Sequence, residues 1–244
     1  MKYLVIGLLC FSSVAQAQSY KKVHRKAIMA DSHNDLLTAA IEKNVLIDQD
    51  LKGKTHSDLN RFKEAGVDVQ IFSVWCDGDK PQPYSWANRE IDTLYAVAKR
   101  NPEKIEITPN YDALKKAVRN EKIAALFGVE GGHMIEDDLN KLDSFYNRGV
   151  RYMTLTWNNS TSWASSAMDE TKMKNNPTAK LGLNDFGKQV VKRMNQLGMM
   201  VDLSHVGEKT FWDAIQTTTK PVLISHSNAY TLCPVFRNLK DDQI

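Results

Sequence analysis

The segment Asp31 to Leu37, DSHNDLL, places a histidine and a carboxylate two residues apart, directly behind the short apolar run 27–30. In an extended strand, residues i and i+2 point to the same side, so His33 and Asp35 would project together from the strand end. An imidazole and a carboxylate that converge in this way are typical ligands of a divalent metal. The same letters also suit a surface turn, because Asp, Ser and Asn hydrogen-bond their own backbone. The metal hypothesis therefore needs partners elsewhere in the chain.

Three further segments place reactive residue types at the ends of apolar runs. Glu130 follows such a run in FGVEGGH, His205 in VDLSHV and His226 in PVLISHS. A lone carboxylate at the end of a buried strand is costly, so Glu130 is hard to explain by packing. Each residue also has an ordinary interpretation, as a hydrogen-bonded core histidine, a helix cap or an ion-pair partner. Their recurrence at the same end of successive strands favours a shared site.

The number of candidate ligands bears on the number of metal ions. His33, His205, His226, Asp35 and Glu130 form a sensible ligand set for Zn²⁺ or a related ion. Five protein ligands exceed the three that one catalytic zinc usually takes. Two metals that share Glu130 fit the number better, at the ~3.5–4 Å spacing of two-metal hydrolases.

The elements that would position these residues alternate along the chain. Apolar, β-rich runs cover residues 27–32, 67–75, 123–129, 150–156, 199–204 and 221–225. Helical patterns cover residues 57–65, 86–100, 137–148, 184–197 and 208–217, with Asn184 as an N-cap and Gly198 as a stop. Nearly continuous apolar strands between helices predict an α/β fold with a parallel sheet.

A (β/α)8 barrel of the TIM type is the favoured architecture. No Gly-rich dinucleotide or Walker motif follows any strand, which argues against a nucleotide-binding fold. A barrel also gathers its active site at the carboxyl ends of its strands, where the candidate ligands lie. Residues 162–183 are expected to form a loop on that side. Only about six strands are visible, so we expect a barrel truncated after the sixth.

The N-terminus and the composition limit where the protein acts. Lys2, the apolar stretch 3–11 and the small residues Ala15 and Ala17 predict a secretory signal peptide over residues 1–17. We therefore expect a secreted or periplasmic protein without a transmembrane span, and Leu9 before Cys10 argues against lipoprotein anchoring. Loss of Lys2 lowers the formal net charge from +3 to +2, which gives no basic footprint for nucleic acid.

Two cysteines, Cys76 and Cys233, remain after removal of the signal peptide. They could pair in an oxidising compartment, but two distant cysteines are not a disulfide framework. We interpret both as buried hydrophobic residues.

The motifs together resemble one known family. DSHNDLL, GVEGGH, GLNDFGKQVVKRMNQLGMMVDLSHV and PVLISHSNAYTLCPVFRNLKDDQI are similar to segments of the membrane (renal) dipeptidase family of the amidohydrolase superfamily. The resemblance runs from about Ile28 to the last residue. It implies a barrel with two zinc ions, in which His33 and Asp35 hold one ion, His205 and His226 hold the other, and Glu130 bridges them as a catalytic residue.

The same resemblance implies an activity. Two zinc ions would generate a bridging hydroxide that hydrolyses dipeptides, and Arg237 in FRN would bind the free carboxylate of the substrate. Trp157 stands where the best-known members have a substrate-contacting histidine, which puts the substrate range in doubt. The alternatives are a related amidohydrolase for N-acyl amino acids, lactams or lactones, or a catalytically inactive metal-binding fragment.

One residue of the family pattern has no counterpart. The family places an aspartate at the end of its eighth strand, where it orients the attacking water and protonates the leaving amine. We therefore expect residues 18–244 to form a C-terminally incomplete metal-dependent hydrolase barrel domain, the N-terminal portion of a longer dipeptidase. The oligomeric state stays open, with a homodimer among the options.

Overall fold

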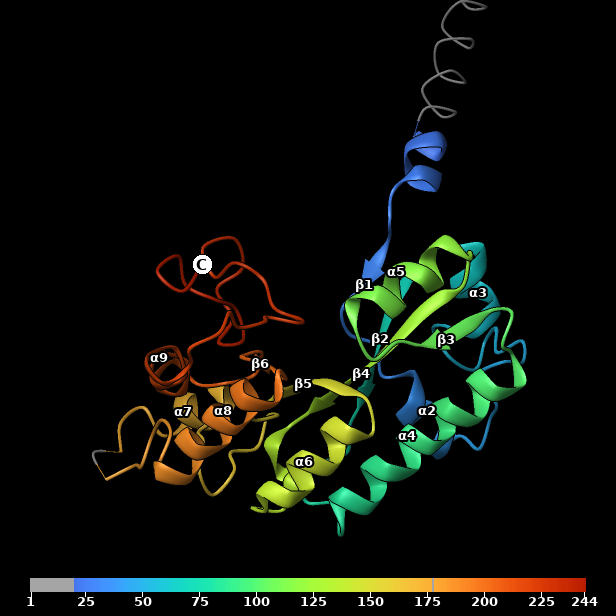
Figure 1. Cartoon of the computed structure of the whole chain (residues 1–244). Coiled ribbons are helices and arrows are strands. Elements are labelled where there is room, and N and C mark those ends of the chain that lie inside the picture. Colours follow the sequence, from blue (N-terminus) through green and yellow to red (C-terminus); the bar gives the residue numbers. More distant parts are fainter. Residues whose placement is uncertain (1–19, 177) are drawn as a thin grey trace, which may run out of the picture.

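The protein forms an α/β structure around one parallel sheet. The computed structural model describes residues 20–176 and 178–244, so the expected signal peptide over 1–17 lies outside the described residues. The strands are β1 (Ala30–Asp31), β2 (Val69–Val74), β3 (Ile105–Ile107), β4 (Ile123–Glu130), β5 (Val150–Thr154) and β6 (Met200–Asp202). Their order is β1-β2-β4-β5-β6, with β3 beside β4 (Figure 1), and all pairs are parallel.

Strand β4 is the centre of this sheet. It pairs with β2 along one edge. Its other edge is shared by two strands: β3 pairs with the start of β4, from Ile123, and β5 pairs with its end, from Phe127 onwards. Seven of its eight residues are buried, as expected for a strand that is covered on both faces. Its last residue, Glu130, is consequently held at the carboxyl edge of the sheet by neighbours on both sides.

Helices connect the strands and cover the sheet. They are α2 (Leu36–Glu42), α3 (Leu59–Glu64), α4 (Pro83–Arg100), α5 (Tyr111–Arg119), α6 (Leu139–Asn147), α7 (Ala167–Lys172), α8 (Asp185–Leu197) and α9 (Glu208–Thr217), with a 3-10 turn η1 at Gly132–Ile135. Figure 1 shows α4, α6 and α8 in a row along the sheet. Over residues 20–176 and 178–244, no helix combines the length and apolar character needed to cross a bilayer.

Most predicted elements are confirmed. Five predicted strands and five predicted helices are present, and α8 has the expected caps: Asn184 Oδ1 accepts a hydrogen bond from Gly187 N at 3.0 Å, and Gly198 ends the helix with φ 77°. Short elements were missed, namely β3, α2, α5, and α7 within the predicted loop 162–183.

The predicted strand 221–225 is wrong. Among the described residues this run forms only an isolated bridge between Asp202 and Leu223. Leu223 donates a backbone hydrogen bond to Val201 in β6 and accepts one from Leu203 just after β6, both at 2.9 Å. Pro221 lacks an N–H, and no further described strand pairs with the outer edge of this run. The segment nevertheless runs parallel to β6 and carries His226 to the carboxyl edge of the sheet.

The two cysteines differ in environment. Cys76 is fully buried in the main hydrophobic core, as predicted. Cys233 is exposed and both thiols are free, so the expectation that Cys233 is buried is wrong. Its segment after His226 is largely exposed, and Leu239 is the residue of this segment that packs against the core.

Glu90 is a carboxylic acid enclosed by the core. It lies on α4 with 0% exposure; its Oε1 accepts a hydrogen bond from Thr38 Oγ1 at 2.6 Å and its Oε2 accepts one from Trp75 N at 2.7 Å. Burial raises the pKa of Glu90 to about 8, and the hydrogen bonds from Thr38 and Trp75 oppose this only in part. The contacts join α4 to α2 and to the end of β2.

Stability should therefore depend on the protonation of Glu90. An unfolded glutamate ionises near pH 4.5, so the free energy of unfolding should fall as pH rises from about 4.5 to about 8. We expect Glu90→Gln to remove this part of the pH dependence, because the amide can donate to Thr38 Oγ1. Urea unfolding between pH 4 and 9, with the exposed Glu64→Gln as a control, measures the effect. Parallel stability curves for wild type and Glu90→Gln would contradict it.

Candidate metal centre

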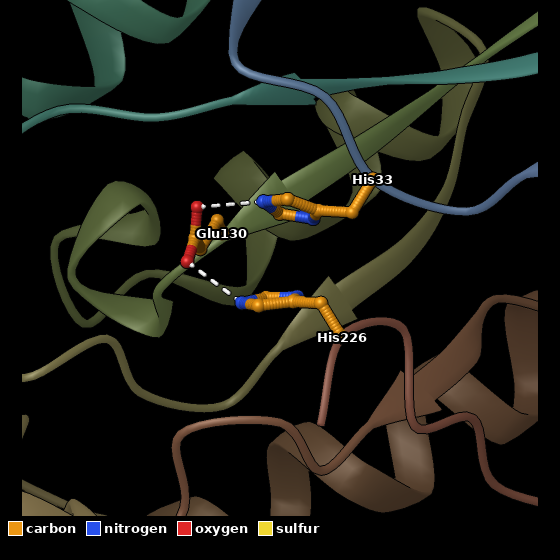
Figure 2. A group of neighbouring side chains, drawn as sticks. All are labelled: His33, Glu130 and His226. Carbon is orange, nitrogen blue, oxygen red and sulfur yellow. Dashed lines mark hydrogen bonds and ion pairs between the residues drawn. The ribbon is translucent and has the colours of Figure 1, made fainter. Parts of the chain in front are cut away.

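Three histidines surround the buried carboxylate of Glu130, which is 4% exposed. The Nε2 atom of His33 lies 3.1 Å from Oε2 of Glu130. The Nε2 atoms of His205 and His226 lie 2.8 Å and 3.3 Å from Oε1. Figure 2 shows His33 and His226 reaching the carboxylate from one side, with their rings stacked at 3.8 Å between centroids. The two carboxylate oxygens thus face separate imidazoles.

These side chains come from the carboxyl edge of the sheet. His33 follows β1, Glu130 ends β4 and His205 follows β6. His205 has a left-handed backbone with φ 64°, a conformation that is costly for a residue with a side chain and that occurs often at functional sites. His226 follows the bridge at Leu223.

The carboxylate of Asp35 lies at the rim of the cluster. Its Oδ1 is 3.3 Å from His33 Nε2, and its side chain is 56% exposed. The structure thus brings all five predicted ligands together, with Asp35 beside His33 on the Oε2 side of Glu130 and the other two histidines on the Oε1 side.

The charges at the centre depend on one another. Burial would raise the pKa of Glu130, but hydrogen bonds from His205, His226 and His33 hold it well below its usual range. Burial would lower the pKa of His33, but Asp35 and Glu130 together raise it to about 10. Burial lowers the pKa of His205, the hydrogen bond to Glu130 opposes this in part, and the positive charge of Arg237 adds to the lowering, which favours the uncharged imidazole that a metal ion requires.

The donor set fits a divalent metal ion. One ligand atom each from His33, Glu130 and His226 lies within 4.8 Å of the others. His205 Nε2 is 2.9 Å from His226 Nε2, so two imidazole nitrogens face each other beside a carboxylate. Nitrogen and carboxylate ligands in such proximity suit Zn²⁺, and a cation among them would offset the repulsion between their lone pairs.

Arg237 and Trp157 lie beside this cluster. Arg237 and His205 both line a cavity of about 770 Å³ between α7, α9 and the segment 230–243. The guanidinium Nη2 lies 3.5 Å from the carbonyl oxygen of His226. The Trp157 ring lies 6.4 Å from His205 and 5.0 Å from Trp75, between ring centroids. Both residues can therefore contact a molecule that approaches the histidines.

Sequence reasoning missed residues that support the histidines. Tyr152 Oη contacts His33 Nδ1 at 2.9 Å, and Ser225 Oγ contacts His226 Nδ1 at 2.8 Å. Tyr152 has this position because Gly128 lacks a side chain: a Cβ there would lie 2.0 Å from Tyr152 Cζ. A glycine inside an apolar strand was the available signal for this close approach.

Metal affinity should depend steeply on pH. In the metal-free protein His33 holds a proton up to about pH 10, and an ion that binds its Nε2 must displace that proton. We expect the dissociation constant for Zn²⁺ to fall roughly tenfold per pH unit between pH 6 and 8 for each proton displaced. Competition with a chromophoric chelator, corrected for the chelator's own titration, measures this slope. A pH-independent constant would rule out displacement of the proton.

Comparison with known proteins places the chain in a family. Mouse Dipeptidase 3 is 36% identical over 221 residues, which cover 88% of this chain and 43% of that protein. An uncharacterized dipeptidase of Schizosaccharomyces pombe is 34% identical over 246 residues, covering 92% of this chain and 58% of that protein. The chain thus spans about half the length of these curated relatives.

Solved structures show the same fold. The probable dipeptidase PvdM from Pseudomonas aeruginosa matches with a TM-score of 0.82 and 23% identity, over 93% of this chain and 58% of that one. A metallo peptidase from Rhodobacter sphaeroides, liganded with a phosphinate mimic of the dipeptide L-Ala-D-Ala, matches with a TM-score of 0.78 and 23% identity, over 88% of this chain and 69% of that one. These likenesses confirm the predicted TIM-barrel type of α/β fold. The model of the membrane dipeptidase family, peptidase family M19, matches residues 17–244, and the chain belongs to this family.

Proposed function

We propose that the protein is a zinc-dependent dipeptidase with two metal ions at Glu130. The observation that carries the proposal is the division of the Glu130 carboxylate. Its Oε2 faces His33, with Asp35 behind, and its Oε1 faces His205 and His226. A carboxylate with nitrogen ligands at each oxygen is suited to bridge two ions, one held by His33 and Asp35 and the other by the remaining histidines.

Different groups of the site would have different roles in hydrolysis. Bound zinc ions would supply a hydroxide nucleophile near neutral pH and polarise the scissile carbonyl. Glu130 holds the ligands in place, and its low pKa keeps it ionised throughout the working range. Arg237 offers a planar pair of N–H donors to a free carboxylate. A cavity of about 770 Å³ that contains Arg237 and reaches His205 is large enough for a dipeptide.

A substrate panel would test this proposal against its alternatives. Purified full-length protein loaded with zinc should hydrolyse dipeptides faster than N-acyl amino acids, lactams or lactones. The N-acyl amino acids, lactams and lactones are included because of Trp157. Its indole N–H can donate a hydrogen bond but does not titrate as the imidazole of the family histidine does, which can change the substrate range. Turnover of an acyl amino acid with inert dipeptides would identify a related amidohydrolase. Zinc binding without any turnover would identify a metal-binding protein.

Removal of Glu130 should release metal from both positions. In Glu130→Ala, each half of the site loses the carboxylate oxygen that faces its histidines, so zinc content after dialysis should fall from two equivalents to less than one. Glu136→Ala is the control: it removes an exposed carboxylate six residues further along the chain and should leave both equivalents of zinc bound. Elemental analysis of the two variants makes the measurement. Retention of two ions by Glu130→Ala would disprove the bridge.

Arg237 should discriminate substrates by their carboxylate. In Arg237→Ala, kcat/KM for dipeptides should fall roughly 10- to 100-fold, because charge-assisted hydrogen bonds contribute about 1.5–3 kcal/mol. The C-terminal amides of the same dipeptides lack the negative charge and should be affected much less. Steady-state kinetics on both series gives the ratio. An equal loss on both would assign Arg237 a structural role.

A further inference from the structure

Both ring nitrogens of His226 are engaged, and the one that faces away from Glu130 contacts a hydroxyl group. Nδ1 lies 2.8 Å from Ser225 Oγ. The Ser225 hydroxyl in turn donates to Asp202 Oδ2 at 2.6 Å. A hydroxyl has one hydrogen, so Ser225, which gives it to Asp202, accepts the hydrogen bond from His226 Nδ1–H. Nδ1 of His226 therefore carries a proton, and Nε2 is the ring nitrogen that is left to face Glu130 or a metal ion.

Asp202 is able to impose this direction. It is fully buried at the end of β6 and accepts from Thr154 Oγ1 at 2.6 Å, Ser225 N at 2.9 Å and Ser204 Oγ at 3.1 Å. All of these donors are neutral, and within the described part of the chain no lysine or arginine forms an ion pair with Asp202. A buried carboxylate without a paired cation is costly, and it takes every available hydrogen from its neighbours. The Ser225 hydroxyl is held in the donor role.

The other two histidines have the same arrangement with different residues. His33 Nδ1 contacts Tyr152 Oη at 2.9 Å, and Tyr152 donates its own hydrogen to the carbonyl oxygen of Ser32 at 3.2 Å. His205 Nδ1 contacts Asn158 Oδ1 at 3.0 Å, an atom that can only accept. Three unrelated side chains thus give each ring an oxygen acceptor at Nδ1 and leave each Nε2 towards Glu130. Such outer partners fix the tautomer of metal-binding histidines.

We propose that Asp202 is a positioning residue of the metal centre, which acts through Ser225 to keep the proton of His226 on Nδ1 and its Nε2 free for a metal ion. The inference rests on the proposed function in taking Nε2 of His226 as a ligand of one of the two zinc ions. Asp202, Ser225 and His226 thus form a hydrogen-bond relay. The buried carboxylate of Asp202 decides which atom donates and which accepts in each of its hydrogen bonds.

Substitution of Asp202 by asparagine should reverse the relay. The amide NH2 of Asp202→Asn can donate to Ser225 Oγ, and the Ser225 hydroxyl is then free to donate to His226 Nδ1. The ring proton moves to Nε2, which in that state cannot bind a metal. We expect the affinity for one of the two zinc ions to fall roughly 10- to 100-fold. Ser225→Ala removes the hydrogen bond at His226 Nδ1 without favouring the opposite tautomer, so it should lower the zinc affinity less than Asp202→Asn does.

Thr154→Val is the matched control. It deletes an equally short hydrogen bond to the same carboxylate, 2.6 Å from Thr154 Oγ1, but leaves Ser225 and His226 intact. If Asp202 acts through the relay, Thr154→Val should lower the unfolding temperature yet retain zinc affinity. If Asp202 only stabilises the fold, Thr154→Val and Asp202→Asn would lower zinc affinity in proportion to their loss of stability, and the proposal would be overturned.

The tautomer can be read directly. Full-length protein labelled with ¹⁵N-histidine and freed of zinc shows by NMR at pH 8.5 which nitrogen of His226 carries the proton, and chelator competition gives the zinc affinity. We expect a proton on Nδ1 of His226 in the wild type and none on Nδ1 in Asp202→Asn; a variant that keeps the Nδ1 proton overturns the proposal. Should Asp202→Asn not fold, Ser225→Ala must lose the Nδ1–H preference and Ser225→Thr must restore it. The expected tautomers without zinc binding would support the relay and refute the proposed metal function.

Discussion

The carboxylate of Glu130 is the group on which the site depends. At 4% exposure its negative charge has little access to water, so neighbouring groups must compensate it. Three imidazoles and the Ser73 hydroxyl, at 3.3 Å, do so from different segments of the chain. Each segment reaches Glu130 only because β4 is in register with β2 and β5. A slip of one residue would turn Glu130 to the opposite face of the sheet, and all of these contacts would be lost together.

The sequence predicted the parts of the structure that are local. Strands buried on both faces are apolar throughout, so β4 and β5 stood out, and a polar residue at the end of such a run indicated Glu130 and His205. Strand β3 was missed because it has three residues with Glu106 in the middle, too few for a recognisable pattern. The prediction of a strand at 221–225 was wrong for the opposite reason. This run has an apolar, β-rich sequence, but a strand also needs neighbouring strands to pair with.

The supporting residues could not be predicted because their roles depend on approach across the sheet. Tyr152 reaches His33 over the space left by Gly128, a relation between three strands that no local pattern contains. Asp202 was visible in the sequence as a carboxylate inside an apolar run. Its environment depends on Ser225, a residue of a different segment, which donates a hydrogen bond to it. Spacing along the chain indicates candidate ligands, whereas their orientation is decided by tertiary contacts.

The segment after β1 and the segment after the bridge at Leu223 meet at the site. Ser32 Oγ donates to the carbonyl oxygen of Ser225 at 2.6 Å, across a sequence separation of 193 residues, and the rings of His33 and His226 stack beside this contact. Closing so long a loop costs conformational entropy, which later contacts must offset. Chains dominated by such distant contacts fold slowly, and these two segments can meet only after β1 and β6 have joined the sheet. A metal centre with ligands from both segments would therefore form only in chains that have already folded, and its binding energy would slow their unfolding rather than guide the early steps of folding.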